Sequence, residues 1–266
     1  MNYSYTQISQ FVTCPRRYRY RYLDGWQEKE LRAAMLFGRA FEQALAALFR
    51  GQDPAAVLFE QWTTARELNL TYSGRDTWDG MLQQGVQLLE RFVQDGRVAI
   101  PNPATHQQMQ FNRTLGSGHA FVAFVDAMGQ LDGQSCVLEW KTSSARFPDE
   151  PLGIAALDPQ LVCYSWMTGI EAVAQVAFVR KRSPEVQYLR ATITDEQRAD
   201  FEALVEDTVR RIESGLFLPQ SGIRFPQNPC TTCPFVGLCL EQRELVEGAL
   251  LRKPGVDLGL FDELSY

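Results

Sequence analysis

Two carboxylates and a lysine stand close together in the middle of the 266-residue chain. Asp126 lies in the apolar segment FVAFVDAM, Glu139 follows in VLEWKT, and Lys141 comes two positions after Glu139. Residues i and i+2 of a strand point to the same face, so Glu139 and Lys141 share one face while Trp140 takes the other. If the two segments pair through a turn at 132–133, where Asp-Gly is a hairpin signal, Asp126 lies beside Glu139.

This trio has the residue types that phosphodiester hydrolysis needs. Carboxylates bind hard divalent cations such as Mg²⁺ or Mn²⁺. Such an ion can activate water and stabilise negative charge on a phosphate. A lysine can position the water or neutralise the charge that develops. The alternative is an exposed strand that carries a structural ion pair, which a single Glu-x-Lys often is.

Three cysteines, Cys230, Cys233 and Cys239, follow one another in NPCTTCPFVGLC with the spacing C-x2-C-x5-C. Clustered cysteines in a chain with few of them favour metal binding over a disulfide scaffold. A tetrahedral site needs a fourth ligand. Two other cysteines, Cys136 and Cys163, are expected to be ordinary buried residues.

Hydrophobic periodicity and turn residues predict the elements around these groups. Helices are expected first, then three strands, a helix, two strands and a long helix behind the TDEQ capping pattern at 194–197. We therefore expect an α/β protein with a helical N-terminal part and a cysteine-bearing C-terminal segment. The predicted helices cover 4–23, 34–51, 54–68, 77–95 and 158–170, and the predicted strands cover 108–115, 119–131, 134–142, 173–181 and 186–193.

The D-x12-E-x-K arrangement resembles the PD-(D/E)XK nuclease superfamily. Gln160 and Tyr164 in DPQLVCY match the Q-x-x-x-Y motif of its RecB-like branch, and FGRAFEQAL occupies the place of that branch's G-x-x-x-H helix. Glu42 stands four residues after Gly38, where the family usually has histidine. The segment TQISQFVTCPRRY looks like the N-terminal signature of the same branch. The resemblance covers roughly residues 4–240.

The likeness is greatest to the iron–sulfur members of that branch, the AddB nuclease domain and the CRISPR-associated exonucleases of the RecB type. It implies that Cys14 joins Cys230, Cys233 and Cys239 in holding a 4Fe–4S cluster. Four thiolates also suit a structural zinc ion, which is the alternative.

The resemblance also implies a restriction-endonuclease-like fold, with a central mixed sheet flanked by helices. A single nuclease domain is expected over 1–250. Its parts are a helical N-terminal part (about 1–100), a catalytic core (about 105–215) and an iron–sulfur segment made of residue 14 and 228–240. Residues 251–266 form a C-terminal tail.

Site roles follow from the same resemblance. Asp126 and Glu139, with Glu42 as a third ligand, are expected to hold Mg²⁺ or Mn²⁺. Lys141 is the expected catalytic lysine. Gln160 and Tyr164 are expected to contact DNA or to orient Lys141.

Four residues of CPRRYRYRYL, namely Arg16, Arg17, Tyr18 and Arg19, are expected to contact DNA. The arginines would follow the phosphate backbone while the tyrosine ring stacks on bases. The alternative is a solvated helix face whose tyrosines are half buried.

The formal net charge of −6 neither indicates nor excludes a nucleic-acid partner, because local charge matters more than the total. No signal peptide and no apolar run of about 18 residues is evident, so a cytoplasmic protein that does not engage a membrane is expected.

The expected function is a metal-dependent DNA nuclease, an exonuclease acting on DNA ends or single strands in repair or recombination. One alternative is a non-catalytic DNA-binding or scaffold subunit that works with a helicase or integrase. Another is a nuclease that trims DNA for CRISPR adaptation. The tail segment DLGLF (257–261) resembles a sliding-clamp-binding peptide, although apolar tails often dock on their own domain.

Overall fold

The computed structural model describes residues 2–220 and 222–253. The chain divides into two compact units. The first combines residues 1–30, 113–122 and 202–266, and the second holds residues 31–112 and 123–201. The predicted carboxylate site therefore falls in the second unit, and the four cysteines predicted to act together fall in the first.

A mixed β-sheet forms the centre of the second unit. Its strands are β5 (Val98–Ala99), β6 (Gln107–Thr114), β7 (Ala120–Leu131), β8 (Gln134–Ser143), β9 (Ala172–Val179) and β10 (Glu185–Thr192). Four of these strands lie in the order β7–β8–β9–β10, and β5 and β6 also pair with β7. The β8–β9 pair is parallel, whereas β7–β8 and β9–β10 are antiparallel. A parallel pair needs a crossover connection, and the chain between β8 and β9 supplies one.

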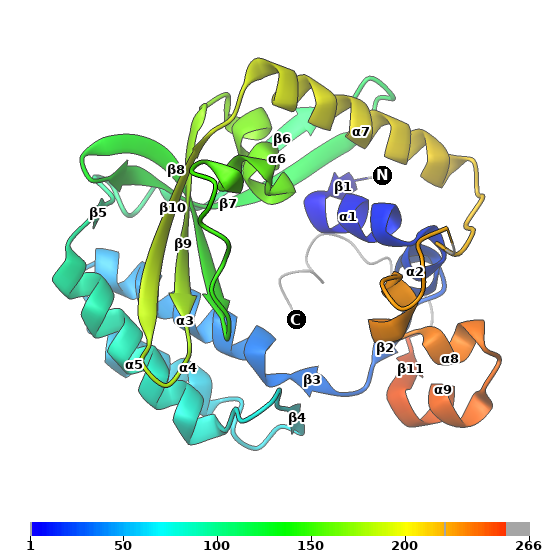
Figure 1. Ribbon diagram of the computed structural model, residues 1–266, viewed down its shortest axis with the longest axis horizontal. Helices are drawn as coiled ribbons and strands as arrows, with labels where there is room; N and C mark the ends of the chain where they lie inside the picture. The colour runs from blue at the N-terminus through cyan, green and yellow to red at the C-terminus, as the bar shows by residue number, and fades with distance from the viewer. Residues whose placement is uncertain (1, 221, 254–266) are drawn as a thin grey trace. The chain divides into compact units, whose positions relative to one another are not determined.

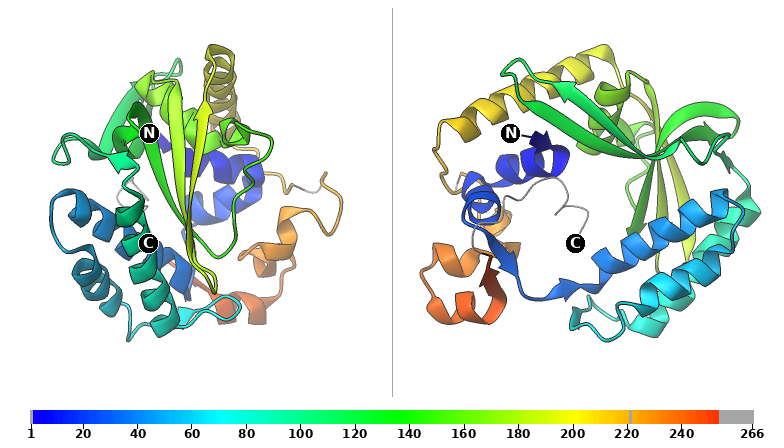
Figure 2. Two further views of the ribbon diagram at one scale, coloured as in Figure 1. Left: turned by 60° about the vertical axis from the view of Figure 1, so that its left-hand side comes forward. Right: turned by 180° about the vertical axis from the view of Figure 1, so that it is seen from behind.

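Three helices cover one face of this sheet: α3 (Ala33–Phe49), α4 (Pro54–Thr63) and α5 (Trp78–Asp95). Figure 1 shows them lying together beside the strands, and both views of Figure 2 show the same grouping. Their apolar side chains form one core with Leu138, Ala174, Val176 and Phe178 of the sheet, and Trp140 packs against it. The crossover helix α6 (Pro159–Thr168) follows a short 3₁₀ turn, η2 (Ile154–Leu157). Because strand residues alternate, Glu139 and Lys141 point to the face opposite Leu138 and Trp140.

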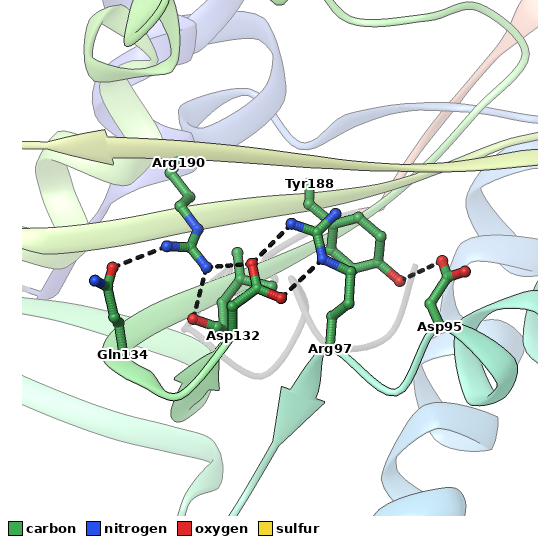
Figure 3. Close-up of polar contacts among 7 residues, drawn as sticks. Asp95, Arg97, Asp132, Gln134, Tyr188 and Arg190 are labelled. Carbon is green, nitrogen blue, oxygen red and sulfur yellow. Dashed lines mark hydrogen bonds and ion pairs between the residues drawn. The ribbon is translucent and has the colours of Figure 1, made fainter.

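The β7–β8 hairpin is held at its turn by a network of charged groups (Figure 3). Asp132 and Gly133 adopt positive φ angles of 50° and 77°, as a two-residue hairpin turn requires. Arg97 donates two hydrogen bonds to the Asp132 carboxylate, at 2.9 and 2.7 Å. Arg190 binds the same carboxylate and the Leu131 carbonyl oxygen. The turn, and with it the register of the two strands, is therefore stabilised by the side chain of Arg190 on β10 and by that of Arg97, which directly precedes β5.

The first unit pairs β1 (Asn2–Ser4) in parallel with the first residues of β7, and β2 (Trp26–Glu28) with β11 (Leu250–Arg252). Its helices are α1 (Tyr5–Thr13), α2 (Pro15–Tyr18), the π-helical turn η1 (Arg19–Leu23), most of α7 (Asp195–Glu213), η3 (Pro229–Thr232), α8 (Val236–Cys239) and α9 (Arg243–Ala249). Phe11 and Tyr18 pack edge to face and both contact Phe217. This aromatic group joins the N-terminal helices to the chain that follows α7.

The predicted helix over 4–23 is broken. Cys14 has an extended backbone with φ −165° and ψ 112°, and Pro15 starts a new helix. The break follows from chemistry, because the ring of a proline disfavours a helical conformation in the residue before it.

The sequence did not predict the shortest strands. These are β1, β2, β5 and β11, and the parallel pair β3 (Leu31–Arg32) and β4 (Leu70–Thr71). Two or three residues carry too little periodicity to be recognised.

The other predicted elements agree with the structure to within a few residues, apart from α4, which ends at Thr63, five residues short. Side-chain caps begin three of these helices, and the capping box predicted at 194–197 is one of them. Ser4 accepts from the Gln7 amide, and Asp158 accepts from the Gln160 amide at 2.8 Å. Thr194 and Gln197 bond to each other's backbone amides, which is a complete capping box. The predicted class, a central mixed sheet flanked by helices, is confirmed.

Candidate active site

Asp126 and Glu139 lie where the β7–β8 ladder ends. The last paired residues are Ala127 and Leu138, so Asp126 and Glu139 are the next step of the same register. Beyond this point a side chain replaces the backbone as the hydrogen-bond acceptor, because Oδ2 of Asp126 accepts from the Trp140 amide at 2.8 Å. The hairpin predicted from the Asp-Gly turn thus brings the two carboxylates side by side.

Lys141 links the carboxylates to the crossover helix. Its ammonium forms an ion pair with the Glu139 carboxylate. It also donates to Oε1 of Gln160 at 2.8 Å, and Nε2 of Gln160 donates to the Tyr164 hydroxyl at 3.0 Å. Gln160 and Tyr164 share one face of α6 because they are four residues apart. The three side chains form a continuous series of hydrogen bonds that begins at Glu139.

Glu42 reaches the same region from α3. Its Oε1 accepts from Nε2 of Gln108 at 3.0 Å, and it lines a small cavity together with Gln108, Asp126 and Trp140. One turn earlier on α3, a Cβ at Gly38 would come within 3.3 Å of the Thr142 hydroxyl oxygen of β8. The close approach of α3 to β8 explains how a helix residue comes near strand carboxylates.

The site has the electrostatics of a crowded carboxylate cluster. Burial raises the pKa of Asp126 well above its ordinary range, and the carboxylates of Glu139 and Glu42 add to the rise. Burial likewise raises the pKa of Glu42, against the influence of the Gln108 amide. Burial alone would lower the pKa of Lys141, but the carboxylates of Glu139, Asp126 and Asp158 together outweigh burial and raise the pKa. Desolvation and the repulsion between the carboxylates therefore oppose the ionisation of Asp126 and Glu42.

A divalent cation fits this donor set. Among the described residues, no group of three or more histidine, cysteine, aspartate or glutamate side chains is arranged to hold a metal ion as it stands. However, Oε2 of Glu139 is buried and has no hydrogen-bond partner within the described chain. Glu139 itself is only 2% exposed. A buried carboxylate oxygen without a partner, next to two further carboxylates, is what a hard cation would satisfy.

Several residues of the site were not singled out by sequence reasoning. Arg39 lies three residues before Glu42, and its Nη2 is buried without a hydrogen-bond partner among the described residues. Gln175 is the β9 residue paired with Glu139, and it is almost completely buried. Cys163, which was predicted only to be an ordinary buried residue, lies near the Glu139 carboxylate. Helical spacing from Glu42 could have identified Arg39, whereas Gln108 and Gln175 reach the site only through tertiary contacts.

The family is decided by a comparison of the whole chain with family models. Residues 2–240 match the model of the PD-(D/E)XK nuclease superfamily. The chain belongs to the PD-(D/E)XK nuclease superfamily. Its mixed sheet flanked by helices is the restriction-endonuclease-like fold expected from the sequence resemblance.

Two solved structures resemble the chain at low identity. The crystal structure of SSO0001 matches with 19% identity and a TM-score of 0.41, over 90% of this chain and 85% of that one. A protein from Eubacterium rectale described as "Putative exonuclease" matches with 15% identity and a TM-score of 0.49, over 95% of this chain and 90% of that one. No curated protein sequence matches the chain.

The first unit of this PD-(D/E)XK nuclease brings the four predicted cysteines together. Cys14, Cys230, Cys233 and Cys239 line one small pocket, and none of them forms a disulfide. Burial raises the pKa of the Cys233 thiol, and the neighbouring Cys239 and Cys14 thiols add to the rise. Four free thiols are of the residue type that binds an iron–sulfur cluster or a zinc ion, but no group of three or more such side chains among the described residues is placed to hold a metal as it stands. Cys136 and Cys163 lie elsewhere and are buried, as predicted.

The residues predicted to bind DNA differ in their exposure: Tyr18 is buried, Arg17 lines the thiol pocket, and Arg19 is largely exposed. Tyr18 has no exposed surface and packs against Phe11, Tyr22 and Phe217, so the prediction that its ring stacks on bases is wrong. A ring of this size contributes more to a core than it would at the surface. Arg17 lines the thiol pocket instead of standing free, and its Nε is buried. Arg19 forms an ion pair with Asp24 at 3.3 Å and keeps much of its side chain exposed.

No helix within the described part of the nuclease is long and apolar enough to cross a membrane. The predicted sliding-clamp peptide at 257–261 lies outside the described residues.

Proposed function

We propose that this protein is a metal-dependent deoxyribonuclease of the RecB-like branch, an exonuclease that acts on DNA ends or single strands. One observation carries the proposal: Asp126, Glu139 and Lys141 meet at the end of the β7–β8 ladder, with Gln160 bonded to Lys141. A purely structural domain has no use for two adjacent carboxylates whose mutual repulsion opposes their ionisation.

The carboxylates of Asp126 and Glu139, with Glu42, would hold Mg²⁺ or Mn²⁺. The bound ion supplies positive charge that acidifies water and stabilises the developing charge on phosphate. The chain's own contribution is to hold the oxygens in place. The Trp140 amide fixes Asp126, and the Gln108 amide fixes Glu42.

Lys141 is the residue best placed to act on the reacting atoms. Its ammonium is held from two sides, by the Glu139 carboxylate and by Gln160. About a third of the side chain remains exposed, with a relative accessibility of 31%. From this position it can orient an attacking water molecule or neutralise charge on the phosphate. Gln160 and Tyr164 set its direction and do not need to touch the substrate.

Arg39 is a further candidate for contact with substrate phosphate. It lies on the same helix as Glu42 and close enough for the two charges to interact. Its unpartnered Nη2 offers a donor that an incoming phosphate oxygen would satisfy, since guanidinium groups match phosphate geometry.

The four cysteines would hold a 4Fe–4S cluster, with structural zinc as the alternative. Ligands at residues 14 and 230–239 would close a very long loop, so the group would stabilise the fold by restricting the unfolded chain. Arg17, which lines the same pocket, would offset the negative charge of the thiolates. In that role it is unavailable to DNA, which leaves Arg16 and Arg19 as the candidates of this run for phosphate contact.

Partners beyond DNA rest on sequence alone. A helicase or integrase subunit remains a prediction, as does a sliding clamp bound through 257–261. Clamp pull-down with and without residues 257–266 tests the latter, and equal recovery would end the idea.

Cleavage of end-labelled DNA tests the proposal. The protein is purified without oxygen and incubated with single- and double-stranded substrates in the absence of metal, with Mg²⁺ and with Mn²⁺. We expect cleavage that needs metal, and Lys141→Ala should lower it by at least 100-fold. Successive products from one labelled end would identify an exonuclease and its polarity.

Two outcomes would contradict the proposal. Unaltered cleavage by Lys141→Ala would refute the assigned site. If no substrate is cleaved although the protein retains the metal proposed to bind the cysteines, the result would favour the alternative of a non-catalytic DNA-binding or scaffold subunit. Arg113→Ala is a suitable control, because Arg113 belongs to the first unit, outside the carboxylate site.

A further inference from the structure

The backbone of Gln108 is in an unusual conformation for its residue type. Gln108 is the second residue of β6 and has φ +49°, in the left-handed region that favours glycine. Only three described residues other than glycine have positive φ, and Asp132 at the hairpin turn is another. Non-glycine residues persist in this region where surrounding contacts hold them, and they gather at functional sites.

The segment that carries Gln108 is tied to the sheet beside the carboxylates. The Met128 amide of β7, two residues from Asp126, donates to the His106 carbonyl oxygen at 2.9 Å. His106 is in turn bonded to the Asn102 carbonyl oxygen. The chain therefore enters β6 from an anchored turn, and the conformation of Gln108 sends its amide to Glu42.

Gln107 and Gln108 face the carboxylate cavity together. Both line it with Glu42 and Asp126. The Gln108 amide is engaged with Oε1 of Glu42 at 3.0 Å. The Gln107 amide is buried, and neither its oxygen nor its nitrogen has a hydrogen-bond partner among the described residues. This arrangement leaves one glutamine holding a carboxylate and a second with an unused donor and acceptor at the same cavity.

We propose that Gln108 is a positioning residue of the active site, which holds Glu42 by one carboxylate oxygen and leaves the other oxygen to act with Asp126 and Glu139. The proposal rests on the proposed function, because it assigns Glu42 to the same site. The Gln108 amide can donate to Glu42 but has no acidic proton, so it fixes direction without taking part in proton transfer. The left-handed backbone is the conformational cost of bringing this amide to a helix residue 66 positions away in the chain.

The decisive variant is Gln108→Gly. Glycine suits a φ of +49°, so the melting temperature should stay the same or rise. The amide is lost, so kcat/KM for DNA cleavage should fall roughly tenfold, as expected for one hydrogen bond to a charged group. Mn²⁺ affinity, measured by titration calorimetry without DNA, should fall in parallel. Gln108→Asn is the matched variant, because asparagine tolerates the backbone but is one methylene too short to reach Glu42.

The same substitutions in the Glu42→Ala background complete a double-mutant cycle. Neither should reduce kcat/KM or Mn²⁺ affinity further once Glu42 is gone. The proposal is overturned if Gln108→Gly leaves both quantities unchanged, or if the loss persists in the Glu42→Ala background. A fall in kcat/KM that is accompanied by a lower melting temperature would show that Gln108 has a structural role, and it would also overturn the proposal.

Failure of the proposed function is distinguishable from failure of this inference. If the wild-type protein cleaves nothing but binds Mn²⁺, the function fails while the calorimetric cycle still tests the pair. If the wild-type protein neither cleaves DNA nor binds Mn²⁺, both are overturned.

Discussion

The Nζ atom of Lys141 lies 2.8 Å from Oε1 of Gln160, and this contact joins β8 to the first turn of α6. Gln160 uses its other polar atom, Nε2, to donate to the Tyr164 hydroxyl. The amide is therefore oriented from one side by Tyr164 and orients Lys141 on the other. A short series of this kind would hold the ammonium of the proposed catalytic lysine in one rotamer, which is how supporting residues promote a reaction.

Gln160→Ala should lower kcat by about tenfold with little change in KM, because the lost contact orients a group that acts in the transition state. Tyr164→Phe should have a smaller effect, since it removes only the hydroxyl that orients Gln160. Steady-state kinetics on end-labelled DNA would measure both. In a Lys141→Ala background the Gln160 change should cause no additional loss, and an additional tenfold loss there would contradict the assigned order of contacts.

Asp126→Asn should stabilise the metal-free protein at neutral pH while abolishing cleavage. Burial and the nearby carboxylates raise the pKa of Asp126 in the folded state. The unfolded chain titrates near the ordinary value of about 3.9. Between that value and the raised folded value, the unfolded state releases its proton more readily, so stability is lost as pH rises. Asparagine carries no charge and retains an oxygen to accept from the Trp140 amide.

Thermal unfolding in EDTA between pH 4.5 and 8 would measure this effect. The wild-type protein should lose more stability across this range than Asp126→Asn. Added Mg²⁺ should raise the melting temperature of the wild type and leave the variant nearly unchanged. Parallel pH profiles for the two proteins would show that the carboxylates do not repel one another as inferred.

The register of the carboxylates could be predicted because its causes are local. The Asp132–Gly133 turn and the alternation of VLEWKT are enough to place Asp126 beside Glu139 and Trp140 in the core. The capping box predicted at 194–197 is likewise present, because a cap depends on residues only a few positions apart.

The contacts that complete the site could not be predicted in this way. Gln108 meets Glu42 across 66 positions, and neither polarity nor periodicity marks Gln108 as different from Gln107 or Gln110. Tyr18 shows the opposite error. In a run of alternating arginine and tyrosine it resembles a surface residue, but Phe11 and Phe217 bury its ring completely. Burial of an aromatic residue depends on partners brought by the tertiary fold.

Cys233→Ala should remove the metal proposed to bind the cysteines and lower the melting temperature, because Cys233 lines the pocket shared with Cys14 and Cys239. Cys136→Ala is the control, since Cys136 is also a free thiol but is buried apart from that pocket. Iron, acid-labile sulfide and zinc would be measured on protein purified without oxygen. Iron and sulfide in equal amounts indicate the cluster, and zinc alone indicates the alternative. Unchanged metal content in Cys233→Ala would remove this residue from the ligand set.

Gly85→Ala tests how tightly the helical layer is packed against the sheet that carries the site. Gly85 lies on α5, where an added Cβ would come within 2.8 Å of both Phe37 of α3 and Leu58 of α4. Alanine is the better helix former by about 1 kcal/mol, but overpacking a well-filled core costs about 1–3 kcal/mol. The cost of overpacking should exceed the gain in helix propensity, and the melting temperature should fall by several degrees.

Gly248→Ala is the control for helix propensity. Gly248 lies on α9, and no atom comes within 4 Å of an added Cβ. The same substitution there should raise or maintain the melting temperature, because only the propensity term remains. If both variants were stabilised, the contacts of Gly85 would be looser than the structure indicates. If Gly85→Ala also lowers kcat with Mg²⁺ in excess, the position of α3 relative to β8, and therefore of Glu42 relative to Asp126, depends on this packing.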